Sequence, residues 1–453
     1  SVGERVVRQL HFGWGLLLQH GRPAEARLQF AHALAQAPTS AFLRSELAAA
    51  ALAAQRPSAE AVAWGMGGTW AFRRPRAADE ATSELELWET YAAVRFQPPA
   101  QPLEAEERQL LALGAPASGF VPNGELVPTD GTSTLVAKTL AHRVRHDLEL
   151  ARLLRARGLL PEDVAEAAVV AYRTVLEHAP RPDGPLVLHP TEEQWRLLQP
   201  FHNRRLYVHP SPAIAGRALA PSLPVKLAHS GTAAPSPAGS ALEDGGVLVI
   251  DGLLSAEALA ALREFAELST IWYQERPAYL GAAMCTGFTT PLLDQIAREL
   301  RKALPELLCD LPLANVWAYK YDDELQSGID VHADDAAVNV NLWITPDEDN
   351  LDPSTGGLVV FDATAEQLKN PTFAKFNEGS RAKEELLRST ERRNVTVPYR
   401  QNRAVVFDSA RLHGTQGFAF RRGLRSRRIN VTFLFGPKGA YCPLRRTAEL
   451  RVV

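Results

Sequence analysis

The sequence is poor in cysteine and carries no marked excess of charge. Its 453 residues include only three cysteines, Cys285, Cys309 and Cys442, and these are far apart. An odd number of widely spaced cysteines argues against a disulfide framework and against a zinc ribbon. The formal net charge is -3, so nothing in the overall charge attracts nucleic acid or an anionic membrane surface.

Long apolar runs are also missing. No stretch of about 18 consecutive apolar residues occurs, so no membrane span is predicted. The N-terminal residues lack the pattern of a signal peptide, and we therefore expect a cytoplasmic protein. Hydrophobic residues make up 46% of the chain and charged residues 22%, which is typical of a packed globular protein. The length predicts two or three domains.

Residues 1–180 are predicted to form an all-α domain. A spacing of small, aromatic and small residues followed by proline occurs twice, at Ala26, Phe30, Ala33 and Pro38 and again at Ala168, Tyr172, Val175 and Pro180. This spacing resembles the second helix of a tetratricopeptide repeat, in which small residues allow close helix packing and the aromatic ring fills the groove between repeats. We therefore expect a repeat-like helical domain, with a plain helical bundle as the alternative.

Residues 181–242 form a connecting region rich in proline and glycine. Residues 243–453 are predicted to be mainly β-structure preceded by helices, one of them starting at Ser255. Six runs have the apolar pattern of strands separated by turns, namely 316–321, 338–344, 358–361, 395–397, 404–407 and 429–435. The chain as a whole is thus predicted to be α+β, with an antiparallel barrel or sandwich in its C-terminal part.

The segment His332-Ala333-Asp334 is a candidate metal motif. Iron(II) is commonly bound by two histidines and one carboxylate that leave an open face, and a spacing of two places both side chains on one side of a strand. With 12 histidines and 52 acidic residues, composition alone gives about one His-x-acid pair by chance. The motif therefore indicates a metal site only if its sequence context supports one. Asp335 is an alternative carboxylate ligand, although a spacing of three from His332 takes it off the strand face that carries His332.

The context lies downstream, where a buried strand at 403–407 is followed by a turn and then by His413. A ligand at the end of a neighbouring strand could meet the first two. Further on, Arg428 directly precedes the run 429–435 and Asn430 lies within it. A spacing of two places both side chains on the same face of the strand. An arginine that points into a barrel is costly unless it meets an anion, and a dicarboxylic co-substrate would supply one. Arg425 and Arg427 are the alternatives, although Arg427 has the opposite parity to Asn430.

Taken together, these residues resemble the 2-oxoglutarate/Fe(II)-dependent dioxygenase superfamily, near its prolyl-hydroxylase-like branch. The resemblance covers about residues 243–440 and includes the turn and strand that begin at Gly356-Gly357. It implies a double-stranded β-helix (jelly-roll) core with flanking helices over 243–453. It further implies that iron(II) is held by His332, Asp334 and His413.

The same resemblance implies a site for 2-oxoglutarate. Arg428 would bind its distal carboxylate, and further contacts would come from Tyr321, Tyr319 and Asn430. A buried tyrosine with a satisfied hydroxyl is the alternative interpretation of Tyr321. Trp317 and Trp343 are interpreted as packing residues.

The activity that the resemblance implies is hydroxylation of a C–H bond with O2 and 2-oxoglutarate, releasing succinate and CO2. The carboxylate at Asp334 favours hydroxylation over halogenation. A peptide or protein substrate is expected if the helical half recruits it, because repeat stacks often bind extended peptides. The alternatives are a small molecule, including an anionic one attracted by the arginines at 421–428, and a non-catalytic repeat scaffold. Neither a membrane nor nucleic acid is expected as a partner.

Overall fold

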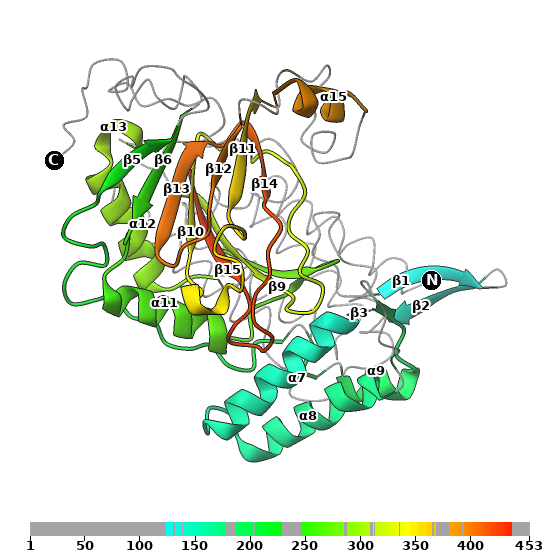
Figure 1. Cartoon of the computed structure of the whole chain (residues 1–453). Helices are drawn as coiled ribbons and strands as arrows, with labels where there is room; N and C mark the ends of the chain where they lie inside the picture. The colour runs from blue at the N-terminus through cyan, green and yellow to red at the C-terminus, as the bar shows by residue number, and fades with distance from the viewer. Residues whose placement is uncertain are drawn as a thin grey trace, which may run out of the picture. The chain divides into compact units, whose positions relative to one another are not determined.

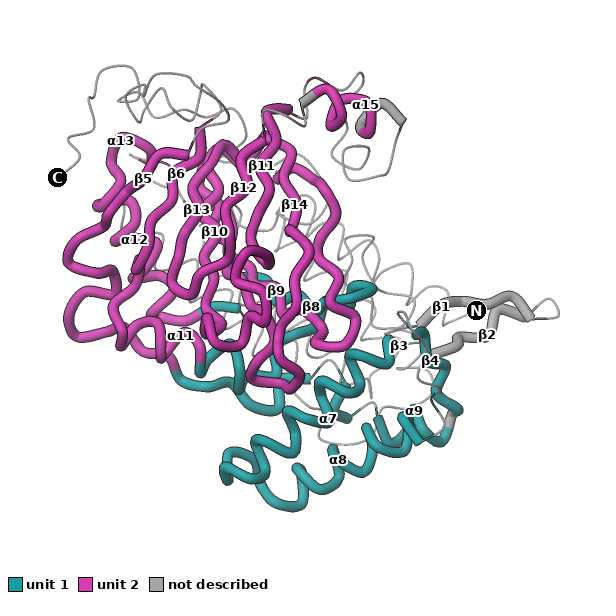
Figure 2. Tube along the Cα trace, viewed as in Figure 1, with its two compact units in different colours: residues 1–73, 82–210, 264–289 teal, residues 74–81, 211–263, 290–453 magenta. Residues whose placement is uncertain are grey.

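The computed structural model consists of two compact units, which Figure 2 shows in different colours. Unit 1 contains residues 1–73, 82–210 and 264–289, and unit 2 contains 74–81, 211–263 and 290–453. The predicted domain limits at 180 and 242 stay predictions. Within these units the structure describes residues 124–129, 132–137, 139–177, 179, 186–198, 200–202, 204–228, 246–284, 288–308, 311, 313–334, 336–364, 367, 381–390 and 394–436.

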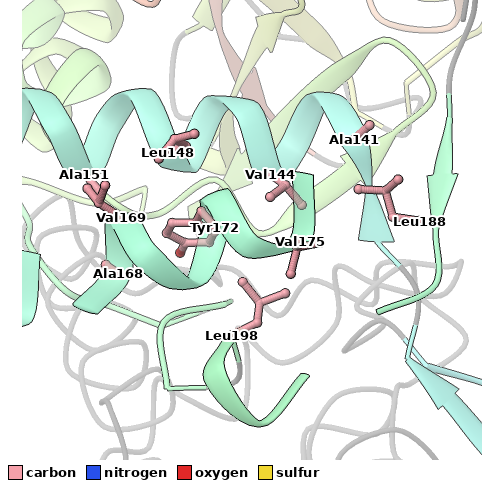
Figure 3. Packing of buried hydrophobic residues seen from close by; sticks show 10 residues of the cluster. All are labelled: Ala141, Val144, Leu148, Ala151, Ala168, Val169, Tyr172, Val175, Leu188 and Leu198. Atoms are coloured by element: carbon pink, nitrogen blue, oxygen red, sulfur yellow. The ribbon is translucent and has the colours of Figure 1, made fainter. Parts of the chain in front are cut away.

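The described part of unit 1 is built on helices α7 (Ala141–Ala156), α8 (Glu162–Leu176) and the short α9 (Glu192–Leu198), as Figure 1 shows. Ala168, Tyr172 and Val175 of the second predicted repeat are buried between α7 and α8, in the cluster drawn in Figure 3. The helical periodicity of this segment is therefore confirmed. The other repeat, at 26–38, lies outside the described residues, so a repeat array stays a prediction.

The described residues of 1–180 include strands beside α7 and α8, and the all-α repeat-like domain predicted for 1–180 as a whole stays a prediction, since most of that range lies outside the described residues. Strands β1 (Gly124–Thr129) and β2 (Thr132–Ala137) pair antiparallel. Two shorter pairs also belong to unit 1. They join β3 (Thr139–Leu140) to β4 (Val187–Leu188), and β7 (Gln274–Arg276) to β8 (Tyr279–Ala283).

Unit 2 contains two antiparallel sheets. Within this unit, the strands of the large sheet follow the order β5 (Val225–Ala228), β6 (Val247–Asp251), β13 (Arg403–Asp408), β10 (Val338–Trp343), β15 (Ile429–Phe435) and β9 (Leu313–Tyr321). The small sheet has the order β12 (Val395–Val397), β11 (Leu358–Thr364) and β14 (Arg411–Thr415). All six runs predicted to be strands are strands in the structure.

The chain alternates between the two sheets in the manner of a jelly roll. From β9 in the large sheet it passes to a single bridge between His332 and His413 at the edge of the small sheet, and then to β10 in the large one. It continues through β11 and β12 in the small sheet, β13 in the large, β14 in the small and β15 in the large. This winding gives the antiparallel β-fold that the sequence predicts, with its inner faces around one cavity.

Strand β14, which carries His413, is missing from the predicted strands. The sequence indicates a turn at residues 408–411 and predicts no strand directly after it. The glycine at position 414 has a packing reason, since a Cβ atom at this position would lie 3.2 Å from Cγ2 of Val331. Gly414 thus allows β14 to approach the segment that carries His332.

Helices flank the sheets of unit 2. Helix α12 (Pro291–Ala303) begins after Thr290, whose Oγ1 accepts a hydrogen bond of 3.1 Å from the backbone N–H of Leu293. Helix α11 (Ala256–Leu268), of which only residues 256–263 belong to unit 2, follows the predicted cap Ser255, and the short α13 (Pro305–Leu308) follows α12. Among the helices of the described residues, none is long and apolar enough to cross a membrane.

Helix α15 (Arg381–Thr390) belongs to the long insertion between β11 and β12. Its Leu386 and Leu387 pack against an apolar cluster that includes Val331, Ala333 and Leu412. These three residues alternate along the chain with the predicted metal ligands. The back of each ligand-bearing segment is therefore covered by apolar contacts.

Candidate metal and anion site

The three predicted metal ligands come together in unit 2. His332 and Asp334 lie on the segment that leads into β10, and His413 lies on β14. Two backbone hydrogen bonds join His332 to His413, at 2.8 and 2.7 Å. One potential ligand atom from each of the three residues lies within 4.8 Å of the other two. Nε2 of His413 is 3.4 Å from Asp334 Oδ2, and Nε2 of His332 is 3.8 Å from Oδ1.

Both histidines are oriented by backbone carbonyls. Nδ1 of His332 lies 2.8 Å from the Asp330 carbonyl oxygen, and Nδ1 of His413 lies 2.9 Å from that of Arg411. A carbonyl oxygen can only accept a hydrogen bond, so in the neutral imidazole Nδ1 carries the proton. The lone pair of each Nε2 is then directed to the space beside Asp334, as in many protein metal sites.

Asp334 is buried, yet its pKa is lowered. Burial acts to raise the pKa of this carboxyl group, but the hydrogen bond and charge of His413, the charge of His332 and a hydrogen bond from Asn339 outweigh it. Asp334 is therefore a carboxylate at neutral pH, which is the form that binds a metal. Asp335, the alternative ligand, lies outside the described residues.

Asn339 holds the Asp334 carboxylate from strand β10. Its Nδ2 donates a hydrogen bond of 2.7 Å to Asp334 Oδ2, and both side chains are buried. Replacing Asn339→Leu keeps the approximate volume but removes the donor. We expect the affinity for Mn²⁺, used as an air-stable substitute for iron(II), to fall about tenfold, because outer-shell partners orient the ligands of a metal. Calorimetric titration of the metal measures this.

The matched control for that prediction is Asn315→Leu. Asn315 is also a buried amide of the large sheet, on β9, and it is not among the residues that line the cavity. An equal loss of Mn²⁺ affinity in both variants would contradict a specific role for Asn339.

The triad opens onto a cavity lined by residues of both sheets. All seven predicted site residues line it. Besides the triad they are Tyr319 and Tyr321 of β9, Asn430 of β15, and Arg428, which directly precedes β15. The structure therefore brings together residues that are up to 111 positions apart in the sequence, from Tyr319 to Asn430. Neutral side chains that were not predicted as site residues complete the lining, namely Trp317, Ile329, Asn341, Leu358, Thr415 and Thr432.

Arg428 is a buried cation with no anionic partner among the described residues. It is 2% exposed, and its Nε donates a hydrogen bond of 2.7 Å to the Gly356 carbonyl oxygen. Its Cζ lies 4.6 Å from the centre of the Tyr321 ring and 5.7 Å from that of Phe418. Its Nη1 is buried and has no hydrogen-bond partner within the part of the chain that the structure describes. Aromatic rings offset only part of the cost of burying a charge, so this guanidinium is suited to an external anion.

The neighbouring Arg427 differs in this respect. Its Nη2 lies 2.8 Å from Asp323 Oδ1 and 3.6 Å from Asp322 Oδ2, and all three side chains are buried. Arg425 is exposed and is not part of the cavity lining. Among the three arginines weighed from the sequence, Arg428 is thus the one placed to bind an anion in the cavity.

The Gly356-Gly357 turn positions the acceptor for Arg428. Gly356 has a φ of 79°, which favours glycine. A Cβ atom at Gly357 would lie 1.8 Å from the Val397 carbonyl oxygen, which no side chain could accommodate. The two glycines therefore bring the backbone close enough to fix the direction of the guanidinium.

Two of the remaining predicted residues, Tyr321 and Asn430, have hydrogen-bond partners in the cavity lining. The hydroxyl group of Tyr321 lies 3.2 Å from Thr415 Oγ1, a link between the large and the small sheet. Asn430 stands opposite Tyr319 in the register of β15 and β9, and its Nδ2 donates to Thr432 Oγ1 at 3.3 Å. Trp317, interpreted from the sequence as packing, also lines the cavity.

No protein-family model matches the chain, and no curated protein sequence matches it. Several solved structures are similar to it at low identity. HygX from Streptomyces hygroscopicus, with nickel, 2-oxoglutarate and hygromycin B bound, is 15% identical, with a TM-score of 0.31 over 43% of this chain and 84% of HygX. A prolyl hydroxylase from Trichoplax adhaerens, in complex with a hypoxia inducible factor peptide, is 12% identical, with a TM-score of 0.29 over 44% and 87%. An oxidoreductase of the 2OG-Fe(II) oxygenase family from Burkholderia pseudomallei is 12% identical, with a TM-score of 0.28 over 45% and 91%.

Proposed function

We propose that this protein is an oxygenase that depends on iron(II) and 2-oxoglutarate and hydroxylates a C–H bond of an organic substrate. One observation carries the proposal. Two histidines and a carboxylate converge on the same cavity as a buried arginine that has no anionic partner among the described residues. A metal-chelating acid with a second carboxylate would satisfy both features at once.

Each group of the site has a part in this reaction. His332, Asp334 and His413 would hold the metal through Nε2, a carboxylate oxygen and Nε2. When bound, iron(II) would couple the oxidation of the 2-oxo acid to the activation of O2. Arg428 would orient the acid through its distal carboxylate, while the surrounding rings exclude water and strengthen that interaction. The balanced reaction converts the substrate, O2 and 2-oxoglutarate to the hydroxylated product, succinate and CO2.

The nature of the organic substrate is a separate matter. A peptide or protein substrate is favoured by the repeat-like pattern at 26–38, which lies outside the described residues. A small molecule is the alternative. The proposal is therefore made for the oxidation reaction, and the substrate expectation stays a prediction.

An anaerobic titration tests the proposal directly. We expect a weak visible absorption band when iron(II) and 2-oxoglutarate are added together without O2, because the 2-oxo acid chelates the metal. Iron(II) alone should give no such band, and the band should be lost in His413→Ala. A well-folded wild-type protein that gives no band would contradict the proposal and favour the non-catalytic scaffold.

A further inference from the structure

Trp343 lies directly behind the cavity lining, next to Arg428 and Asn430, and is not itself among the lining residues. It is the last residue of β10, is fully buried and stands opposite Asn430 in the register with β15. Side chains two positions apart point to the same side of a strand, so Trp343 shares its side with Asn341, which lines the cavity. The centre of the Trp343 ring is 5.9 Å from Cζ of Arg428.

The indole N–H of Trp343 has no acceptor. Nε1 is buried and makes no hydrogen bond with the described residues, and the same holds for Nη1 of the adjacent Arg428. Both groups are donors only, so neither can satisfy the other. A buried donor without a partner is costly, and two such donors on neighbouring side chains indicate a common acceptor that comes from outside the chain.

The groups around the indole leave it in a fixed position. The Tyr399 ring stacks on Trp343 with an interplanar angle of 28° and ring centres 5.3 Å apart. The Tyr399 hydroxyl group donates a hydrogen bond of 2.5 Å to the Thr345 carbonyl oxygen and is thereby engaged elsewhere. An indole held in this way offers its N–H at little cost in side-chain entropy.

We infer that the Trp343 indole N–H is a second hydrogen-bond donor, beside Arg428, for the distal carboxylate of the 2-oxo acid. The inference rests on the proposed function and names a specificity-determining residue within that site. A guanidinium alone attracts many anions. Two donors of fixed direction select an acid whose second carboxylate reaches both, so Trp343 favours 2-oxo dicarboxylic acids over 2-oxo monocarboxylic acids.

The test compares two acids and two variants by anaerobic calorimetry on the Mn²⁺-loaded protein. Trp343→Phe removes the N–H and keeps an aromatic ring, and we expect it to weaken 2-oxoglutarate binding about tenfold. Binding of 2-oxopentanoate, which has the same chain without the distal carboxylate, should stay unchanged. Trp272→Phe is the matched control, since Trp272 is likewise a fully buried tryptophan but is not among the residues that line the cavity, and it should leave both affinities within about twofold.

A second measurement follows the wild-type protein, and the variant serves only to assign one signal. The chain has eight tryptophans, so a spectrum of the protein with ¹⁵N-labelled indoles should show up to eight N–H signals. We expect one signal to move downfield with 2-oxoglutarate and not with 2-oxopentanoate, and to be the one missing in Trp343→Phe.

Two results would overturn the inference while leaving the proposed function intact. One is tight 2-oxoglutarate binding that Trp343→Phe does not change. The other is an equal loss of affinity for both acids, which would indicate that the substitution disturbs the binding of their shared 2-oxo acid group at the metal. If the wild-type protein binds no 2-oxoglutarate at all, the proposed function itself is wrong and the inference falls with it.

Discussion

Replacing Asp334→Ala is expected to abolish metal binding while the protein stays folded. Asp334 is the only carboxylate of the described metal-ligating group, and two histidines without it form a weak, neutral site. We expect Mn²⁺ affinity to fall by more than about 100-fold, beyond the usual cost of losing an outer-shell partner. Metal-dependent formation of succinate should be lost as well. Calorimetry and a succinate assay measure the two effects.

Asp335→Ala serves as the control for this prediction, because the sequence leaves Asp335 as the alternative ligand. It should retain both metal binding and turnover. Circular dichroism would show that each variant keeps its fold. Metal binding that survives in Asp334→Ala and disappears in Asp335→Ala would reverse the assignment of the carboxylate ligand.

Replacing Arg428→Met and Arg427→Met should have opposite consequences, although the two residues are adjacent and equally buried. Arg428→Met removes the cation that is expected to meet the distal carboxylate. We expect 2-oxoglutarate affinity to fall about 100-fold or more, as when one partner of a buried charge pair is truncated. The free energy of unfolding without ligand should stay the same or rise, because an unpaired buried charge is lost.

Arg427→Met should instead destabilise the protein. It leaves the buried carboxylates of Asp322 and Asp323 without this partner, which costs about 3–5 kcal/mol in comparable cases. Urea unfolding followed by circular dichroism measures the loss, and calorimetry on the folded fraction should show near-normal 2-oxoglutarate binding. If the effects of the two variants were exchanged, Arg427 would be the anion-binding residue.

Much of the C-terminal fold could be predicted, because its strands have strong local patterns. The runs at 338–344 and 429–435 alternate or stay apolar over a whole strand, and they become β10 and β15. Strand β14 could not be predicted, since Gly414 is there for a contact with Val331, 83 positions away. Strand β5 is short and only half-buried, so its local signal is weak.

The sequence predicts which site residues share a strand face, but it does not predict which charged side chains pair with one another. The spacing of two places Arg428 and Asn430 on one face, and His332 and Asp334 on another. The pairing of Arg427 with Asp322 and Asp323 depends on chain segments about a hundred positions apart that only the tertiary structure brings together. For the same reason the sequence indicates only packing for Trp343, whose unpartnered N–H follows from its surroundings.

The alternation around the His332 segment has a consequence for how this region can evolve. Val331 and Ala333 face the apolar cluster beneath α15, while His332 and Asp334 face the cavity. In residues 331–334, packing residues thus alternate with candidate metal ligands. Substitutions of one apolar residue for another can accumulate at Val331 and Ala333 without changing the candidate ligands. A single inserted or deleted residue would reverse this alternation. The ligand side chains would then face the apolar cluster, and the apolar side chains would face the cavity. Substitutions are therefore tolerable in this stretch, whereas changes in its length are not.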